Sequence, residues 1–406
     1  MILFEDAIKL IKENSFSLGV EEKEILDSCN FILAEDIFAK ENHPSFDNSA
    51  VDGFAVKFCD LQNATRENPI NLKIAFTIKA GDEENNILGN NSCGRIMTGA
   101  IIPNGTTAVV MKEKCEANTE SVKFFSAVKE GENIRYTGDE IKKGEIVLKS
   151  GIEITPAVIS LLATLGYEKI NVFKKPKIAI ITTGTELKEI REELQKGKIR
   201  NSNKYFLLSA LKNMGVEINF QAHNVNDSKE EIYNALKNGI DNSDVTIITG
   251  GISVGDYDFI KDVLQDLNAE EIFCGVAIKP GKPTYFGKVK NKIVFGLPGN
   301  PVAVGVIFYE MVYPFLNILS GKNLSLKQSE AVITKSISKK TKRVELLRGH
   351  IEKINKEILV TPILKQGSHM LSGFANADCL IEFPLEKSAL NEGEKVLIHF
   401  LPWNNI

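Results

Sequence analysis

Residues 245–258 read VTIITGGISVGDYD, and this stretch decides how the centre of the chain is expected to fold. Its first part, Val245–Ile248, is mostly apolar and β-branched, as in a strand buried on both faces of a parallel sheet. Three glycines and two aspartates follow directly. Glycines let a backbone approach a ligand closely, and carboxylates bind cations or hydroxyl groups. The stretch therefore predicts a strand followed by a ligand-binding loop.

Strands and helices alternate on both sides of this stretch. KIAIIT (177–182) is a second apolar strand, and NKYFLLSALKNMG (203–215) is a helix that ends at a glycine. Ser228 and Glu231 have the spacing of a capping box and open the next helix. This alternation predicts a doubly wound α/β domain, with an open, largely parallel sheet and helices on both faces. We expect this central domain over residues 176–322.

The flanking segments have other patterns. Short β-type runs and Gly/Pro/Asn turns predict a β-rich domain inserted at residues 44–138. Apolar or alternating strands predict a small all-β barrel or sandwich over residues 323–406, and we take the barrel as the prediction. Residues 1–43 and 139–175 are expected to form a helical linker domain.

Composition limits the class of protein. The chain carries 49 basic and 53 acidic side chains, and this net charge of −4 gives no sign of binding to nucleic acid or to an anionic membrane. The six cysteines are scattered without a Cys-x-x-Cys pair, as expected for reduced thiols. The N-terminal MILFEDAIKLIKE is typical of an amphipathic helix, not of a signal peptide. The apolar segment 301–319 contains Glu310, Pro314 and Asn317, which favours a buried helix over a membrane span. We expect a cytoplasmic protein.

Polar residues follow each strand of the central domain, where ligands bind in open α/β sheets. In chain order the residues singled out after the strands are Thr183 and Glu186, then Asp227, then Ser253, Asp256 and Asp258, then Lys279 and Lys282, and last Asn300 with the flanking Pro298 and Pro301. The carboxylates suit Mg²⁺, and the lysines suit phosphate or another oxyanion. Asn300 is expected to cap the last helix, which leaves free N–H groups for an anion. A site for a phosphorylated ligand, a divalent metal and a second anion is predicted.

Each of these clusters, taken alone, is also explained by a helix cap or a tight turn. Five such clusters at five successive strand ends favour a site. Three common sites are disfavoured by sequence. ITGGISVG is not the dinucleotide motif Gly-x-Gly-x-x-Gly, Gly281-Lys282 precedes Pro283 instead of the Ser or Thr of a P-loop, and no G-x-S-x-G hydrolase elbow occurs.

The ordered set of loops resembles the molybdopterin molybdenumtransferases, the MoeA family that includes the gephyrin E domain. The matching pieces are DNSAVDGFAVK (47–57), GRIMTGAIIPNGTTAVVMKE (94–113), GENIRYTGDEIKKG (131–144), ITTGTEL (181–187), TGGISVGDYD (249–258), IKPGKPTYFG (278–287), GLPGNPVAV (296–304) and QGSHMLSGFANADCLI (366–381). The resemblance implies an enzyme that inserts molybdate into adenylylated molybdopterin and releases AMP with help from Mg²⁺, the last step of molybdenum cofactor biosynthesis. It also implies an elongated homodimer with each active site at the subunit interface.

The resemblance also assigns site residues. The implied catalytic residues are Glu186, Asp227, Asp258, Lys279 and Lys282, and the first three of them are the implied metal ligands. The implied substrate-binding residues are Asp52, Thr183, Gly250, Gly251, Ser253, Asp256, Pro298, Asn300, Pro301, Arg343, Arg348 and Ser368. The lysines and one arginine would hold oxyanions, and the carboxylates would hold Mg²⁺ or position the pterin.

The chain departs from the usual family pattern at several positions. Thr185, Thr107 and Asn201 stand where the family often has acids, and Asp139-Glu140 reverses the usual acid order. These changes are expected to weaken the site and to alter its affinity for metal. Because Glu186 and the lysines remain, we do not expect loss of activity.

Three alternative functions remain open at this point. An adenylyltransferase shares the central fold but is usually a short single domain, and a tungstate-inserting paralogue would look alike. A gephyrin-like scaffold would bind a receptor peptide without turnover. Expected partners are adenylylated molybdopterin and molybdate, with contacts to the adenylylating enzyme and to maturation factors of apo-molybdoenzymes.

Overall fold

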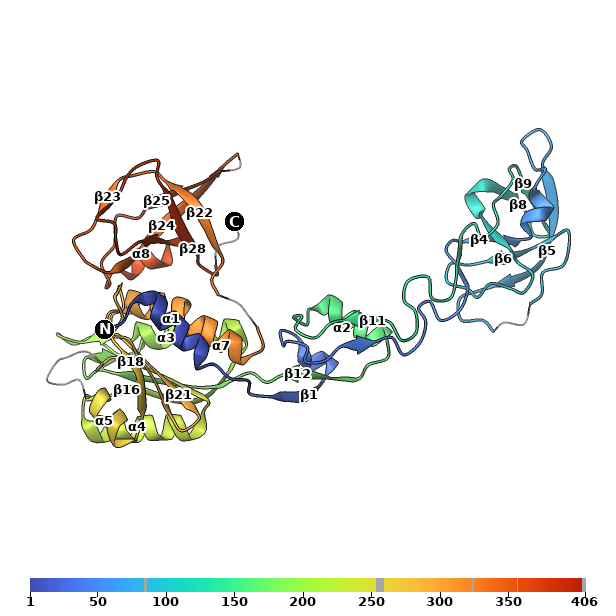
Figure 1. The fold of residues 1–406 in the computed structure, drawn as a ribbon. Helices are drawn as coiled ribbons and strands as arrows, with labels where there is room; N and C mark the ends of the chain where they lie inside the picture. The colour runs from blue at the N-terminus through green and yellow to red at the C-terminus, as the bar shows by residue number, and fades with distance from the viewer. Residues whose placement is uncertain (84–85, 253–258, 323–324, 356, 404–406) are drawn as a thin grey trace. The chain divides into compact units, whose positions relative to one another are not determined.

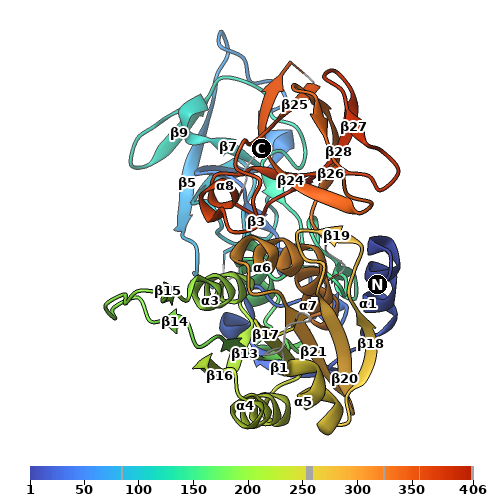
Figure 2. The same cartoon turned by 90° about the vertical axis from the view of Figure 1, so that its left-hand side faces the viewer.

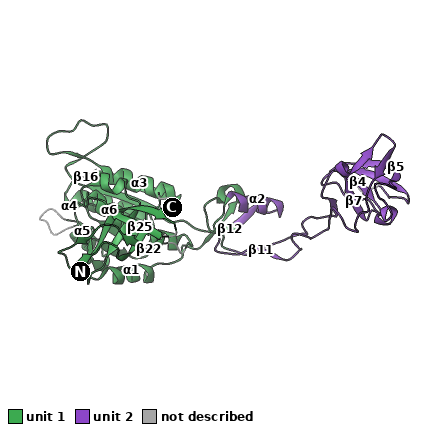
Figure 3. Ribbon diagram, turned by 90° about the horizontal axis from the view of Figure 1, so that it is seen from above, with its two compact units in different colours: residues 1–34, 153–155, 171–406 green, residues 35–152, 156–170 purple. Residues whose placement is uncertain are grey.

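The structure is a computed structural model that describes residues 1–83, 86–252, 259–322, 325–355 and 357–403. The chain forms two compact units (Figure 3). Unit 1 comprises Met1–Ala34, Glu153–Thr155 and Asn171–Ile406, and unit 2 comprises Glu35–Ile152 and Pro156–Ile170. The division into four domains expected from the sequence stays a prediction.

A six-stranded sheet forms the centre of unit 1, in the order β16-β13-β17-β21-β20-β18. Its strands are β13 (Lys177–Thr183), β16 (Glu217–Val225), β17 (Val245–Thr249), β18 (Glu270–Cys274), β20 (Tyr285–Val289) and β21 (Lys292–Leu297). The pairs β16–β13, β13–β17 and β17–β21 are parallel, and β20 runs antiparallel to both neighbours. The prediction of a largely parallel sheet is confirmed.

Helices cover both faces of this sheet, because its inner strands are apolar on both sides. Every residue of β17 is buried. Figure 1 shows α4 and α5 on one face, with α1, α3 and α7 on the other. Their bounds are α1 (Phe4–Glu13), α3 (Ser202–Met214), α4 (Lys229–Asn242), α5 (Ile260–Asp266) and α7 (Tyr313–Leu319). Helix α1 packs its buried stripe, Phe4, Ala7 and Ile11, into the same apolar core as α7. The doubly wound α/β fold is confirmed.

Helix termini in this unit follow their sequence signals. The side chain of Asn201 caps α3 by accepting from the backbone N–H of Lys204, and the helix ends at Gly215 with φ of 63°. Ser228 caps α4 by accepting from the backbone N–H of Glu231. These caps fix where the strand-end loops leave and re-enter the helices.

The apolar segment that follows β21 is one long helix in three parts. Helix α6 (Pro301–Ile307), the π-helical turn η4 (Phe308–Val312) and α7 are continuous. Pro301–Leu319 is long and apolar enough to cross a membrane by composition, but 89% of it is buried inside the protein. The expectation of a buried core helix agrees with this position.

A closed five-stranded barrel follows in unit 1, formed by β24, β25, β22, β28 and β26 in that circular order. The elements of this region are β22 (Gln328–Ile333), β23 (Ile337–Ser338), β24 (Val344–Ile354), β25 (Glu357–Pro362), α8 (Leu371–Ala375), β26 (Cys379–Phe383), β27 (Ala389–Leu390) and β28 (Lys395–Phe400). The short strand β19 (Ile278–Lys279) of the α/β region pairs with β24 of the barrel, and Lys279 lies opposite Glu345 in this pairing. Figure 2 labels both strands. The predicted barrel is confirmed.

Unit 2 contains a six-stranded sheet in the order β7-β4-β6-β5-β9-β8. Its strands are β4 (Gly53–Val56), β5 (Ile70–Ile78), β6 (Ser92–Ile96), β7 (Ala108–Met111), β8 (Cys115–Ala117) and β9 (Ser121–Phe124). The aromatic rings of Phe54 and Phe124 meet edge to face in its core. This sheet makes the inserted region β-rich, as the sequence predicts.

Residues 1–43 and 139–175 hold more extended structure than the helical character expected for them. Their elements are α1, β1 (Val20–Glu24), η1 (Ile25–Ser28), β2 (Ile37–Phe38), β11 (Ile146–Leu148), α2 (Pro156–Thr164) and β12 (Lys169–Phe173). Strand β1 alternates exposed and half-buried residues, which is the strand period. The apolar spacing of three and four residues occurs in α1, and the alternation elsewhere produces strands. The remaining short elements of the chain are η2 (Phe58–Leu61), η3 (Lys112–Lys114), β3 (Asn48–Ser49), β10 (Ile134–Arg135), β14 (Leu187–Lys188) and β15 (Ile199–Arg200).

Candidate functional site

The carboxyl ends of four parallel strands are tied together by hydrogen bonds. Gly184, after β13, donates its N–H to the carbonyl oxygen of Val225 at the end of β16, at 3.0 Å. The hydroxyl of Thr183 donates to the carbonyl oxygen of Thr249 at 3.3 Å. Gly250, after β17, donates its N–H to the carbonyl oxygen of Leu297 at 3.2 Å. The loops that the sequence marks as functional therefore begin side by side.

A cavity of about 600 Å³, here called the strand-end cavity, opens between these loops. Eight of the residues assigned from the sequence line it: Thr183, Glu186, Asp227, Gly250, Gly251, Pro298, Asn300 and Pro301. They come from the ends of β13, β16, β17 and β21, as the rule for ligand sites in open α/β sheets requires.

Two glycines with positive φ lie where these loops meet. Gly250 has a φ of 92°, and a Cβ atom there would lie 2.6 Å from the carbonyl oxygen of Thr183. Gly184 has a φ of 146°, and a Cβ atom there would lie 2.8 Å from a carboxylate oxygen of Glu186. A side chain at position 250 would meet backbone and push the two loops apart, whereas one at position 184 would meet the carboxylate of Glu186, which can move.

Two carboxylates in the strand-end cavity are candidates for holding a cation. One oxygen of Asp227 accepts from the backbone N–H of Thr185 at 3.1 Å and from its hydroxyl at 3.4 Å, and Glu186 is exposed in the same cavity. Mg²⁺ is commonly held by one or two carboxylates together with waters and substrate phosphates, so this pair fits it. The described residues contain no group of three or more His, Cys, Asp or Glu side chains that could hold a metal. Ser253, Asp256 and the third expected ligand, Asp258, lie outside the described residues.

Two positions that depart from the family pattern have structural uses of their own. Thr185 supplies the two donors that hold Asp227. The side-chain NH₂ of Asn201 donates to the hydroxyl of Thr182 and to the side-chain oxygen of Asn224, both at 2.8 Å. A carboxylate at position 201 could donate to neither group, because it has no N–H. The amide at this position therefore belongs to a buried polar network.

A second cavity of about 500 Å³, here called the oxyanion cavity, shares Pro283, Pro298 and Asn300 with the strand-end cavity. The other residues assigned from the sequence that line it are Lys279, Lys282, Arg343, Arg348 and Ser368. Its lining thus holds four cationic side chains against one carboxylate, Glu345. Such an excess of cations favours an anionic ligand.

Arg348 gives the oxyanion cavity a buried positive charge. The side chain is 1% exposed, and its Nη2 atom donates to the carbonyl oxygens of Lys365 at 2.8 Å and Gly367 at 3.1 Å. Among the described residues its Nε atom has no hydrogen-bond partner. Burial lowers the pKa of the guanidinium to about 10, so it remains protonated at neutral pH. A buried cation that donates to two neutral carbonyl oxygens is a strong attractor for an anion.

Asn300 does not cap α6, which corrects one expectation from the sequence. It occupies the N-cap position, but its side chain makes no capping hydrogen bond. Asn300 is exposed and lines both cavities instead. The first turn of the helix is met by the loop of Ser368, whose carbonyl oxygen accepts from the N–H of Val302 at 3.2 Å.

Asp52 belongs to unit 2 and is described within that unit alone. Its carboxylate accepts from the N–H and the hydroxyl of Thr98, at 2.9 and 2.8 Å, and pairs with Lys112 at 3.2 Å. The hydrogen bonds from Thr98, followed by that from Lys112, lower the pKa of Asp52 to about 2. Asp52 is therefore an ionised, oriented carboxylate at neutral pH.

Two residues of unit 1 were missed by sequence reasoning. Asn203, in the strand-end cavity, is 9% exposed and donates its side-chain NH₂ to the carbonyl oxygen of Gly299 at 2.8 Å. Glu345, in the oxyanion cavity, is 4% exposed and pairs with Lys279. The signal for Asn203 was its place beside the helix cap, and the signal for Glu345 was its alternation with Arg343 in RVEL.

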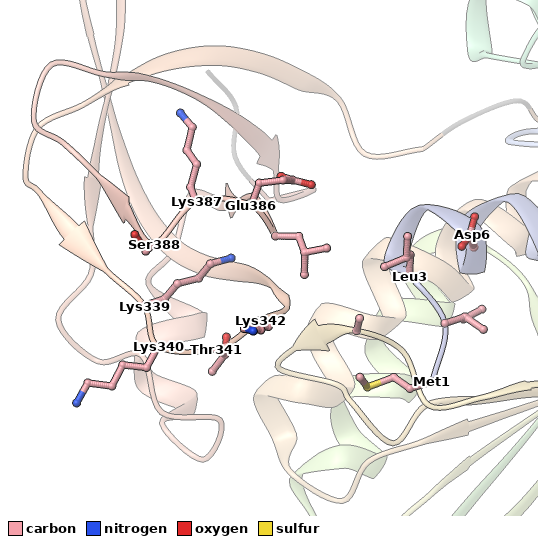
Figure 4. A pocket seen from close by; sticks show the side chains of 13 residues that line it. Met1, Leu3, Asp6, Lys339, Lys340, Thr341, Lys342, Glu386, Lys387 and Ser388 are labelled. Atoms are coloured by element: carbon pink, nitrogen blue, oxygen red, sulfur yellow. The ribbon is translucent and has the colours of Figure 1, made fainter.

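A third cavity of about 750 Å³ lies away from the strand ends (Figure 4). Lys339, Lys340 and Lys387 line its barrel side, and Met1 and Leu3 line the other. Lys339 is already bound to three carbonyl oxygens, those of Arg343, Phe383 and Pro384, and Lys387 pairs with Glu394. These two cations are satisfied within the protein, so the cavity is a weaker candidate for an anion site.

The fold and the two joined cavities define a class of protein: a multidomain α/β protein with a candidate site for an anionic ligand at the carboxyl edge of its sheet, beside a β-barrel that supplies cationic side chains. Models of three regions match the chain. They are the MoeA N-terminal region (domain I and II) over residues 2–166, the probable molybdopterin binding domain over 179–318, and the MoeA C-terminal region (domain IV) over 330–401.

Full-length relatives agree with these matches. A protein named molybdopterin molybdenumtransferase from Haemophilus influenzae is 36% identical over 403 residues, covering 98% of this chain and 97% of its own. Another of that name from Bacillus subtilis is 36% identical, covering 92% of this chain and 87% of its own. The crystal structure of a molybdopterin biosynthesis MoeA protein from Pyrococcus horikoshii OT3 has a TM-score of 0.80 at 28% identity, covering 99% of this chain and 100% of its own. The chain belongs to the MoeA family of molybdopterin molybdenumtransferases, a family of transferases in molybdenum cofactor biosynthesis, as the sequence resemblance predicts.

Proposed function

We propose that this chain inserts molybdate into adenylylated molybdopterin and releases AMP with the help of Mg²⁺. The observation that carries the proposal is the buried, carbonyl-bound Arg348 in a cavity that also holds Lys279, Lys282 and Arg343. Molybdate is a tetrahedral dianion, and such a ligand needs several cationic donors around it. Family membership supports the same reaction.

The adjoining cavities suit the two substrates. The strand-end cavity has glycine-lined backbone and carboxylates, which suit the phosphate and pterin part of an adenylylated ligand. The oxyanion cavity suits molybdate. Pro298 and Asn300 line both, so the phosphate link of one substrate and the oxyanion would lie on two sides of the same loop. Proximity of this kind lowers the entropic barrier to transfer.

The roles of individual side chains follow from their charge and place. Lys279 and Lys282 neutralise negative charge that gathers as the phosphate link breaks, and Arg348 holds the oxyanion. Glu186 and Asp227 would hold Mg²⁺, with Asp258 as a further ligand. When bound, that ion supplies charge neutralisation at the phosphates. Thr185 holds Asp227 in place, and Asn203 stabilises the loop of Gly299 by a hydrogen bond.

Further parts of the proposal concern assembly and location. We propose a cytoplasmic homodimer, and we propose that Asp52 binds substrate. Contacts with the adenylylating enzyme and with maturation factors of apo-molybdoenzymes are part of the same proposal. Analytical ultracentrifugation tests the dimer, since a monomer at micromolar concentration would contradict it.

The function is tested by measuring AMP release from adenylyl-molybdopterin with Mg²⁺, in the presence and absence of molybdate or tungstate. The proposal expects release that depends on the oxyanion and yields a metal-loaded pterin. Formation of adenylyl-molybdopterin from ATP would support the adenylyltransferase instead. No release under any condition, together with binding of a receptor peptide, would support the scaffold. Faster release with tungstate than with molybdate would identify a tungstate-inserting enzyme.

A further inference from the structure

Glu345 is the carboxylate among the lining residues of the oxyanion cavity. It is 4% exposed, whereas its partner Lys279 has a side chain that is 49% exposed. The Nζ atom of Lys279 lies 3.3 and 3.2 Å from the two carboxylate oxygens, and the hydroxyl of Thr341 donates to one of them at 2.6 Å. The ammonium group of Lys279 is thus held by Glu345, while about half of the lysine side chain stays exposed.

This pair joins two parts of unit 1. Lys279 lies on β19 of the α/β region and Glu345 on β24 of the barrel, and the two residues face each other in the parallel pairing of these strands. Arg343 adds a second link, since its Nη1 atom donates to the carbonyl oxygen of Ile278 at 3.4 Å. The position of Lys279 therefore depends on a barrel residue distant in sequence.

The pair has two opposite effects on an anion. An ammonium group carries three N–H donors, so Lys279 can keep Glu345 and still bind a ligand oxygen. Glu345 places that donor in a fixed position, which favours reaction. Its own negative charge faces the same cavity as Lys282, Arg343 and Arg348, and it repels an anion there. Because Glu345 itself is buried, solvent does not fully screen this repulsion.

We propose that Glu345 positions Lys279 for transfer and, by its charge, limits the affinity of the cavity for a free tetrahedral dianion. This inference rests on the proposed function, which assigns the cavity to an oxyanion. This limited affinity keeps free oxyanions from binding tightly in the cavity, so that the bound anion can be transferred to the pterin substrate. Glu345 is a positioning residue and acts through Lys279.

The test is Glu345→Gln, which keeps the shape and the acceptor for Thr341 but removes the charge. Calorimetric titration of the full chain with molybdate alone should give binding about ten-fold tighter than in the unmodified protein, because a repulsive charge is lost. The kcat for AMP release should fall about ten-fold, because the charged partner of Lys279 is lost. Glu352→Gln, an exposed carboxylate on the same strand, is the matched control and should change neither value.

If Glu345 were merely structural, its replacement would weaken molybdate binding and lower kcat together. Weaker or unchanged molybdate binding by Glu345→Gln, in a protein of unchanged melting temperature, overturns the inference. If this variant does not fold, the pair Lys279→Met and Lys279→Met/Glu345→Gln replaces it. Removal of the charge in the Lys279→Met background should still tighten anion binding but no longer change kcat, and any other result contradicts the inference. Absence of molybdate binding by the unmodified protein overturns the proposed function as well.

Discussion

The side-chain NH₂ of Asn203 donates to the carbonyl oxygen of Gly299 at 2.8 Å. This bond connects the first turn of α3 to the loop that leads into α6. Because a carbonyl oxygen only accepts, the bond fixes the orientation of the amide. The side-chain oxygen of Asn203 then has no partner among the described residues, although it is buried. An unpaired acceptor beside the strand-end cavity favours a ligand N–H or O–H group over an oxyanion at this end.

Asn203→Asp should therefore damage the site more than Asn203→Ala. The carboxylate cannot donate to Gly299, and it adds a negative charge beside an anionic substrate, whereas alanine only removes the bond. We expect KM for adenylyl-molybdopterin to rise about five-fold with alanine and more with aspartate. Steady-state AMP release measures this. Ser209→Ala, a change on the same helix outside the strand-end cavity, is the control. Equal KM values for aspartate and alanine would contradict the argument.

Arg348→Met should separate stability from activity. No carboxylate among the described residues pairs with this buried cation, so its replacement by an apolar side chain of similar length is expected to leave the free energy of unfolding unchanged or to raise it by about 1 kcal/mol. Molybdate binding should weaken about 100-fold, because the buried donor is lost. Calorimetric titration and urea denaturation measure the two quantities. Lys353→Met, an exposed change on the same strand, controls for loss of net charge. Strong destabilisation with intact binding would show that Arg348 is structural.

Glu186→Gln should change the Mg²⁺ requirement of the reaction. The variant keeps the size of the side chain but removes one of the three carboxylates expected to hold the ion, two of which line the strand-end cavity. We expect the Mg²⁺ concentration for half-maximal AMP release to rise about ten-fold. Titration of Mg²⁺ at saturating substrate measures it. Glu193→Gln, on the loop between β14 and β15 and outside the strand-end cavity, provides the control. An unaltered Mg²⁺ profile in Glu186→Gln would remove this residue from the metal site.

His399 should make the stability of unit 1 depend on pH. Its Nδ1 atom lies 2.8 Å from Glu310 of η4, and its Nε2 atom lies 3.3 Å from Glu382 of the barrel. Burial lowers the pKa of this imidazole, but the hydrogen bonds and charges of the two carboxylates outweigh burial and raise it to about 9, from 6.5. The contribution to stability is therefore complete below pH 6.5 and is lost as the pH rises through about 9.

Urea denaturation between pH 6 and pH 10 tests this window. The loss should be on the order of 3 kcal/mol, from about 1.4 kcal/mol for each unit of pKa shift. His399→Gln should remove most of the dependence. His350→Gln, a more exposed histidine of the barrel, should leave the profile unchanged. A flat profile in the unmodified protein would mean that His399 is neutral when buried.

The sequence predicted those parts of the site that follow directly from strands. The apolar runs of β13 and β17 identified inner strands, and Glu186 and Gly250 follow them within a few residues. A polar residue that follows a parallel strand lies at the carboxyl edge of the sheet, where ligands bind. The strand pattern alone therefore predicts that such a residue belongs to the site.

The parts that could not be predicted depend on contacts between distant segments. Nothing in the local pattern of IKPGKP shows that Lys279 will face Glu345, because that pairing is made by a barrel strand. The sequence placed Asn300 at a helix cap, yet its side chain makes no capping bond. Capping is a local preference of a few tenths to about 2 kcal/mol, which the surrounding loops can override.

The packing of α1 against α7 has a consequence for synthesis on the ribosome. The chain leaves unit 1 after Ala34, whose N–H donates to the carbonyl oxygen of Asn171 at 2.9 Å. All of unit 2 lies between these two residues in the sequence. A nascent chain therefore completes the sheet of unit 2 before the strands that will cover Phe4 and Ile11 have been made. Domains fold as units during translation. Helix α1 is the first to emerge, and its apolar stripe consequently stays exposed until α7 is translated. During this interval a chaperone could bind the stripe.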